Sequence, residues 1–391
     1  MTAVAVRADS DTSPESNVDS PSATHLANLG AQAFWRYWTG PDHPTSLARA
    51  FVDGLEWYGL MTRRERPTWS TKYAVVKTNA FARLLNFSVP SAVRVIPTLV
   101  FPPQAGHASC VVDYLPAQSQ IRTLRDSGLT EIFSLDWLGI TQTTKHTSIE
   151  DYIQFIDEAV AHLGGKANLV GYCQGGWLAT IYAGLYPEKV NTLTIGGAPI
   201  DFHAGEPMIW QSMQKLAPGG NLAFYKGLVA SGNGVLKGDI MLHSFIGMQP
   251  EGEFRRQLDL AAHMHDPEYV ARYKQFEDWF KFTQNLGGDF YLWIVQHLFR
   301  DNELIKGELY VGGRLVDLKK ITCPLFLLGG KTDHITLPIQ VFRLGDFTST
   351  PKRKVKKRTA PGGHLGLFMG HHALQEYWAP IGKEVYLLSI I

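Results

Sequence analysis

Short runs of consecutive apolar residues alternate with longer segments in which apolar residues recur every three or four positions. The runs cover residues 98–101, 131–137, 168–172 and 190–197. Such runs are typical of strands buried on both faces, and the segments between them are typical of helices. Strands that alternate with helices in this rhythm form a parallel sheet with helices on both faces. The pattern therefore predicts an α/β fold.

Local signals place some of the predicted helices. Ser148 is followed three residues later by Asp151, a capping box that predicts the start of a helix. A loop over residues 104–109 precedes a predicted helix that ends near Ser127. Residues 29–62 are rich in Trp, Phe, Leu and Ala, and we expect helices packed on the outside of the core.

The strand rhythm stops near residue 200 and resumes at residues 324–330 and 354–360, before a final helix from about His372. Between these parts, residues 201–313 are unusually aromatic and have a helical pattern, which predicts a cap or lid over the sheet edge. We expect most of the rings to form the cap's own core, and a minority to line an apolar substrate channel.

These patterns predict the domain organisation. Residues 29–200 and 314–391 form the core, with an N-terminal helical extension, and residues 201–313 form the helical cap. Residues 1–28 lack an apolar run, which predicts a disordered tail rather than a signal peptide. No later segment has the roughly 18 uninterrupted apolar residues of a membrane span, so we expect no transmembrane segment.

Composition and charge exclude some functions. The 391 residues carry a net charge of +1, which argues against capture of nucleic acid by the whole protein. Three cysteines are an odd number in a long chain, which favours a reducing compartment and a cytoplasmic location. Six of the seven residues in 352–358 are positive. They could meet phosphates, an anionic surface or nucleic acid, but we favour an edge strand protected by lysines.

The segment 168–179 carries the strongest chemical signal. A short apolar run enters the turn Gly171–Gly176 and a helix leaves it, which is the G-x-S-x-G nucleophile elbow with Cys173 in place of serine. Glycines are needed because larger side chains would collide with neighbouring backbone. A helix N-terminus also favours the thiolate. The alternative is a buried, inert cysteine at the end of a core strand.

Two further residues complete a candidate triad. In an α/β-hydrolase fold the order along the chain is nucleophile, acid, histidine, and here Cys173 is followed by Asp333 and His364. Asp333 follows a predicted strand, and His364 lies in a glycine-flanked loop after the next one, so both lie where ligands of parallel sheets bind. His364 would take the Cys173 proton or hold it as an ion pair, and Asp333 would orient the imidazole.

The remaining candidates are weaker. The oxyanion hole is predicted to use the N–H of Gln174 and that of Gln104 or Ala105, in the loop after the first core strand. His334 is an accessory candidate, and His107 is a loop histidine with a weaker signal. Cysteine and histidine spacing matches no zinc site, and we expect no metal.

These motifs resemble those of poly(3-hydroxyalkanoate) synthases. Residues 171–176 are similar to their G-x-C-x-G-G lipase-like box, 308–324 to the approach to their acid strand, and 332–334 and 362–366 to their acid and histidine motifs. The resemblance covers residues 95–385 and points most to the short, two-subunit synthases. It implies that Cys173, Asp333 and His364 act as the triad and that His334 is the histidine beside the acid.

Part of the chain also resembles intracellular polyhydroxybutyrate depolymerases, which use a cysteine elbow too. The similar segments are 106–107, 196–201 and 363–370. Those enzymes lack the glycine pair 175–176, so the resemblance favours the synthase side of the superfamily. It implies an α/β-hydrolase fold, with a mostly parallel central sheet, helices on both faces and a mainly helical cap.

The resemblance implies acyl transfer from 3-hydroxyacyl-CoA through a Cys173 acyl-enzyme to a growing polyester. The CoA thioester is a substrate, and no cofactor is expected. Attack by water instead would give a depolymerase or thioesterase, and a third alternative is an inactive granule-associated protein. The polyester chain and the granule surface are expected partners, whereas a partner synthase subunit and a homodimer stay open.

Overall fold

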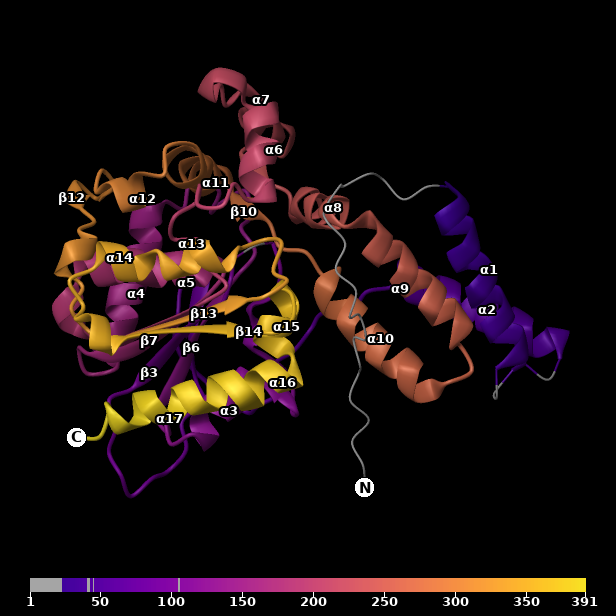
Figure 1. Ribbon diagram of the computed structural model, residues 1–391, viewed down its shortest axis with the longest axis horizontal. Coiled ribbons are helices and arrows are strands. Elements are labelled where there is room, and N and C mark those ends of the chain that lie inside the picture. Colours follow the sequence, from indigo (N-terminus) through magenta and orange to yellow (C-terminus); the bar gives the residue numbers. More distant parts are fainter. Residues whose placement is uncertain (1–22, 41–42, 45, 105) are drawn as a thin grey trace. The chain divides into compact units, whose positions relative to one another are not determined.

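Eight strands form one large sheet in the computed structural model, which describes residues 23–40, 43–44, 46–104 and 106–391. The strands are β1 (Ala74–Thr78), β2 (Ala82–Asn86), β3 (Thr98–Phe101), β6 (Ile132–Trp137), β7 (Ala167–Tyr172), β8 (Val190–Gly196), β13 (Leu325–Gly330) and β14 (Val355–Ala360). Their order across the sheet is β1-β2-β6-β3-β7-β8-β13-β14 (Figure 1). Neighbours from β6 to β14 pair in parallel, whereas β2 pairs antiparallel with both β1 and β6.

Helices connect the strands and cover the sheet. Those next to the sheet are α3 (Gln120–Asp126), α4 (Ile149–His162), α5 (Gln174–Leu185), α13 (Pro338–Phe342), α14 (Leu344–Phe347), α15 (His364–Met369), α16 (His371–Ala373) and α17 (Ala379–Leu387). The capping box predicted for α4 is present, with Ser148 and Asp151 bonded reciprocally. The predicted mostly parallel α/β sheet is therefore confirmed.

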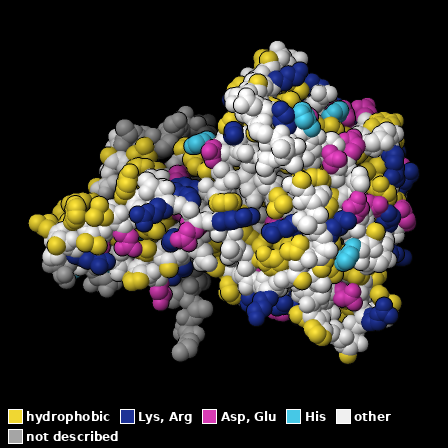
Figure 2. Space-filling model, turned by 180° about the vertical axis from the view of Figure 1, so that it is seen from behind, with side chains coloured by type: hydrophobic (Ala, Val, Ile, Leu, Met, Phe, Trp, Pro, Cys, Tyr) yellow, Lys and Arg dark blue, Asp and Glu magenta, His cyan; other side chains and the backbone are white. Residues whose placement is uncertain are grey.

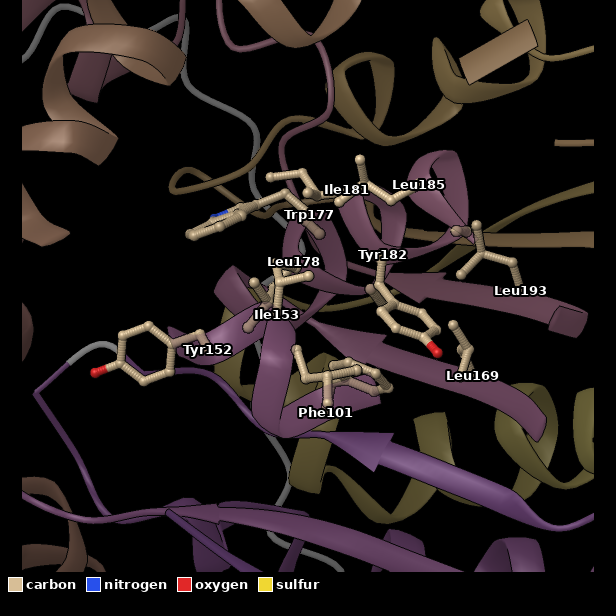
Figure 3. Close-up of a cluster of buried hydrophobic side chains, with 14 of the residues drawn as sticks. Phe101, Tyr152, Ile153, Leu169, Trp177, Leu178, Ile181, Tyr182, Leu185 and Leu193 are labelled. Carbon is tan, nitrogen blue, oxygen red and sulfur yellow. The ribbon is translucent and has the colours of Figure 1, made fainter. Parts of the chain in front are cut away.

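Side chains alternate between the two faces of the sheet. In β13, Leu325 and Leu327 belong to one buried cluster, whereas Phe326 and Leu328 belong to the other. This period of two follows from strand geometry, and an apolar residue at every position is the mark of a strand covered on both faces. Figure 3 shows the first cluster, where strand residues such as Phe101 lie against side chains of α5.

The helix predicted to follow the loop 104–109 begins only at Gln120. A single turn of 3₁₀ helix (Ser109–Val112) and a hairpin of β4 (Asp113–Leu115) and β5 (Gln118–Ser119) come first. The buried carboxylate of Asp113 explains the difference, because it accepts hydrogen bonds from Ser70, from Thr71 and from the Ser119 hydroxyl, and so holds a non-helical backbone. The pair β1 and β2 was not predicted, since neither strand is a run of consecutive buried apolar residues.

Seven helices lie between β8 and β13, with two small hairpins, among the residues that the structure describes. They are α6 (Met208–Leu216), α7 (Ala223–Ser231), α8 (Gly238–Met248), α9 (Pro250–Ala262), α10 (Pro267–Phe280), α11 (Gly288–Trp293) and α12 (Glu303–Lys306). The hairpins are β9 (Val235–Leu236) with β10 (Leu286–Gly287), and β11 (Tyr310–Val311) with β12 (Arg314–Leu315). None of the helices in the described ranges is long and apolar enough to cross a membrane.

The chain divides into two compact units. Gln249–Tyr273 group with the N-terminal residues up to Thr62, and the larger unit holds Arg63–Met248 and Lys274–Ile391. The range 201–313, predicted as one cap, is therefore shared between both units, and its role as a lid stays a prediction.

The smaller unit contains α1 (Ala23–Thr39) and α2 (Leu47–Thr62), as expected for helices in this part of the chain. Inside it, the buried carboxylate of Asp53 pairs with Arg49 at 2.8 Å and accepts a hydrogen bond from the Tyr37 hydroxyl. Its surface carries exposed Trp35 and Phe51. Figure 2 shows hydrophobic side chains gathered in groups on the face of the molecule that it draws. The predicted tail 1–28 is wrong for its last six residues, which are helical, and the rest of it lies outside the described residues.

The basic run 352–358 contributes most of β14, which is the edge strand of the sheet. Lys356 and Lys357 are exposed, and Arg358 forms an ion pair with Glu384. The predicted edge strand is confirmed, whereas the protective role of its charged side chains stays a prediction.

Candidate active site

Cys173 lies in a strained turn between β7 and α5. Its φ of 47° and ψ of −119° are unusual for a residue with a side chain. The flanking glycines have no room for a Cβ: on Gly175 it would lie 2.0 Å from the Phe101 carbonyl oxygen, and on Gly171 2.6 Å from the Cα of Gly176. The glycine spacing that predicts the elbow is therefore a requirement of close backbone packing.

Asp333 lies in the loop that follows β13, and His364 lies after β14, at the start of α15. His364 Nδ1 is 2.7 Å from Asp333 Oδ2, and both side chains are buried. The other carboxylate oxygen accepts hydrogen bonds from the N–H groups of Ile335 (3.0 Å) and Thr336 (2.9 Å). The backbone thus fixes the carboxylate, and the carboxylate fixes the imidazole. His364 was expected in a loop, but it is the first residue of α15, and Gly363 is the N-cap.

Charge and hydrogen bonding set the protonation of His364. Burial alone lowers its pKa, but the negative charges of Asp333 and Cys173, and hydrogen bonds to both, raise it from 6.5 to about 10. These surroundings therefore favour the protonated imidazole. The structure brings Cys173, Asp333 and His364 together, in an arrangement that stabilises an imidazolium beside the sulfur and the carboxylate.

The predicted oxyanion residues lie on both sides of this turn. Gln174 is the first residue of α5, so its N–H has no acceptor within the helix. Gln104 is buried in the loop after β3, and its Nε2 donates a hydrogen bond to the Tyr152 hydroxyl at 2.6 Å. Gln104 and Gln174 line the same small cavity. Ala105 lies outside the described residues, and the oxyanion roles stay predictions.

The loop after β3 is anchored by a contact that the sequence did not reveal. His107 pairs with Thr283 in an isolated antiparallel bridge, and its ring stacks on that of Phe280 at 5.6 Å. Trp279 is buried and donates a hydrogen bond from Nε1 to the Ala108 carbonyl oxygen. Residues 279–284, inside the predicted cap, therefore hold the loop that carries Gln104.

Tyr152 is also absent from the sequence-predicted site. Its hydroxyl meets Gln104, but its position in α4 is that of an ordinary buried aromatic residue. A helical pattern shows that such a residue faces inward and does not show which loop it reaches. No signal in one sequence could have identified this contact.

Three further residues of interest, His334, Cys110 and Cys323, are not part of the candidate triad. His334 is half-buried next to Asp333, and burial lowers its pKa, with the Asp333 charge opposing and the His364 charge adding. Cys110 is buried, whereas Cys323 is partly exposed. Within the described ranges, no group of three or more metal-binding side chains occurs, and the absence of a cofactor stays a prediction.

Several curated proteins that are similar to this chain are named as poly(3-hydroxyalkanoate) polymerases. "Poly(3-hydroxyalkanoate) polymerase subunit PhaC" from Allochromatium vinosum is 27% identical over 280 residues, covering 70% of this chain and 76% of the relative. The protein of the same name from Synechocystis sp. is 27% identical over 267 residues, covering 66% and 69%. The resemblance to poly(3-hydroxyalkanoate) synthases is confirmed by these matches.

A solved structure and a family model complete the comparison. The crystal structure of Paleococcus ferrophilus monoacylglycerol lipase has a TM-score of 0.51 at 18% identity, and it covers 79% of this chain and 99% of its own. This likeness supports the fold, and the predicted α/β-hydrolase fold is confirmed. The model described as "Protein of unknown function (DUF3141)" matches residues 71–369, about three quarters of the chain, and the chain belongs to this family.

Proposed function

We propose that the protein is an acyltransferase that takes a 3-hydroxyacyl group from CoA onto Cys173 and passes it to the end of a growing polyester. One observation carries the proposal: the strained turn holds Cys173 against a His364 ring that Asp333 orients at 2.7 Å. The names of the similar polymerases support the substrate class. The similarity to poly(3-hydroxyalkanoate) polymerases and the α/β-hydrolase fold support an enzyme.

The proposed reaction has two transfers. The Cys173 sulfur attacks the thioester carbonyl, the C–S bond to CoA breaks, and His364 gives its proton to the departing CoA sulfur. The terminal hydroxyl of the polyester then attacks the Cys173 thioester while His364 accepts the hydroxyl proton, and the bond between the acyl carbon and the Cys173 sulfur breaks to release the thiolate. The N–H of Gln174, and one from the loop after β3, would stabilise the oxyanion in both steps. A thiol suits the first exchange, because a thioester is replaced by another thioester.

A hydrolase with the same triad is the alternative, in which water replaces the polyester hydroxyl. Purified protein incubated with 3-hydroxybutyryl-CoA tests the proposal. Release of CoA with formation of polyester supports it, whereas release of CoA with free 3-hydroxybutyrate supports a thioesterase. A parallel incubation with amorphous polyester detects depolymerase activity. No CoA release, with or without added polyester primer, would contradict the proposal.

A further inference from the structure

A second cavity, of about 350 Å³, lies in the larger unit and contains none of the candidate triad. It is formed by the segment before β1, the start of β2, the end of β6, Gln284, and Ala108 and Cys110 in the segment after β3. Its size is within the range of small-molecule sites. The polar and aromatic side chains that line it include Arg66, Trp69, Tyr73, Arg83 and Asp136.

A buried carboxylate forms part of the cavity wall. Asp136 is 5% exposed, and it lies opposite Arg83 in the register of β2 and β6. Arg83 Nε donates a hydrogen bond to Asp136 Oδ2 at 2.8 Å. This cross-strand pair fixes the carboxylate in a buried place, where its oxygens can accept a further hydrogen bond from the amino group of a ligand.

A positively charged side chain, that of Arg66, also lines the cavity. Arg66 is exposed, and the structure records no hydrogen bond or ion pair of its guanidinium within the described residues. Burial raises the pKa of Asp136, whereas the charges of Arg83 and then Arg66 lower it, so Arg66 lies within electrostatic reach of the carboxylate. A free guanidinium is suited to bind a phosphate through two parallel hydrogen bonds.

Two aromatic rings also line the cavity. Trp69 packs against Phe87 with ring centroids 5.2 Å apart, and Tyr73 is 40% exposed and lies 6.3 Å from Trp69. Aromatic faces of this kind stack on nucleobases, at about 1–3 kcal/mol for each base. The cavity therefore combines an acceptor for an amino group, a stacking surface and a cation for a phosphate.

We propose that this cavity binds the adenosine phosphate end of the CoA thioester, with the purine against Trp69 and Tyr73, its amino group on Asp136 and a phosphate on Arg66. The inference rests on the proposed function. In the sheet, β6 is two strands from β7, so the carboxyl ends of these strands are about 10 Å apart along the same edge. The pantetheine arm of CoA separates the nucleotide from the thioester and can span such a distance to Cys173.

Binding of adenosine 3′,5′-bisphosphate, measured by calorimetry, tests the cavity without any turnover. Arg66→Ala should weaken binding about tenfold, as expected for a lost charge-assisted hydrogen bond, and Tyr73→Ala about fivefold. Arg353→Ala, which removes another exposed arginine, is the matched control and should leave binding unchanged. The inference is wrong if the bisphosphate does not bind, if Arg66→Ala binds like the wild type, or if inorganic phosphate binds equally well.

Kinetics separate this inference from the proposed function. With 3-hydroxybutyryl-CoA, Arg66→Ala should raise KM about tenfold at unchanged kcat. With 3-hydroxybutyryl-N-acetylcysteamine, which lacks the nucleotide, the variant should match the wild type. Equal loss on both thioesters would contradict a nucleotide site. If the wild type acts on neither thioester, the proposed function fails, and the calorimetry still decides whether the cavity binds the nucleotide.

Discussion

Two thiols in loops of the same sheet have opposite surroundings. Cys173 is partly exposed in a strained turn at the start of α5, and its charge raises the pKa of the neighbouring His364. Cys110 is 3% exposed in the 3₁₀ turn after the β3 loop. Burial, and then the charges of Asp136 and Asp113, raise its pKa to about 12.

We expect the surroundings, rather than the residue type, to decide which of the two thiols is reactive. A thiolate is the nucleophile, and a neighbouring cation and partial exposure favour it, whereas burial and neighbouring carboxylates oppose it. We therefore expect Cys173 to act as a nucleophile and Cys110 not to.

Replacing each cysteine in turn should give the largest difference in turnover. Cys173→Ala should reduce CoA release from 3-hydroxybutyryl-CoA by about 10⁵-fold, because the acyl-enzyme cannot form. Cys110→Ala should retain turnover within a few-fold and lose only stability, since its side chain is core. Melting temperatures control for folding. Substantial turnover in Cys173→Ala would contradict the whole account.

Replacing His364 or Asp333 should reduce turnover less than replacing Cys173. His364→Ala should lower turnover by about 10³-fold or more, since no other group in this account can move the proton. Asp333→Asn should cost less than His364→Ala, because a thiol depends less on its base than a hydroxyl does. Steady-state rates on variants that melt near the wild type check this order. Equal and small losses at both positions would show that other residues do the work.

The elbow itself can be tested through its glycines. A Cβ on Gly175 would lie 2.0 Å from the Phe101 carbonyl oxygen, so Gly175→Ala should reduce the free energy of unfolding by about 3 kcal/mol and displace the turn. Gly366→Ala is the matched control, because no heavy atom lies within 4 Å of its added Cβ. Denaturant unfolding measures both. Equal stability of the two variants would mean that the turn tolerates a side chain.

His107, in the loop before Cys110, should make the fold less stable in acid. Burial lowers the pKa of His107 from 6.5 to about 4. Between these values the unfolded chain binds more protons, so this group destabilises the fold by about 2 kcal/mol from pH 7 to pH 5. His364 acts in the opposite window, since its raised pKa gives stability that is lost as pH rises from 6.5 towards 10.

His107→Phe should therefore lose less stability than the wild type between pH 7 and pH 5. The difference between the two proteins isolates this residue from carboxylates that titrate in the same range. Urea unfolding at both pH values provides the measurement. Identical losses in the two proteins would show that His107 is not kept neutral by its burial.

The segment that covers the β3 loop should have only a few-fold effect on the fate of the acyl-enzyme. Phe282 is partly buried against the second core cluster, whereas Trp279 is fully inside it. If this segment keeps water from the acyl-enzyme, Phe282→Ala should raise the ratio of hydrolysis to polymer formation a few-fold. Trp279→Ala should mainly lower stability, by about 3–5 kcal/mol. An unchanged ratio in Phe282→Ala would limit the segment to a structural role.

Sequence patterns located the candidate triad because each of its members lies beside a strand end. An apolar run such as Leu325–Gly330 identifies its strand, and a parallel sheet brings the carboxyl ends together. Features that depend on side-chain contacts were not accessible in this way. The Asp113 hydrogen bonds that delay α3, the Tyr152 contact to Gln104 and the grouping of Gln249–Tyr273 with the N-terminal helices all join residues far apart in the chain.

Alkylation of the native protein tests the central difference most directly. Iodoacetamide should label Cys173 about 100-fold faster than Cys110 at pH 7, with rates for each cysteine followed by peptide mass spectrometry. His364→Ala should remove most of this advantage, because the neighbouring cation is lost. The account is contradicted if native Cys173 is alkylated no faster than Cys110, or if its rate is unchanged in His364→Ala.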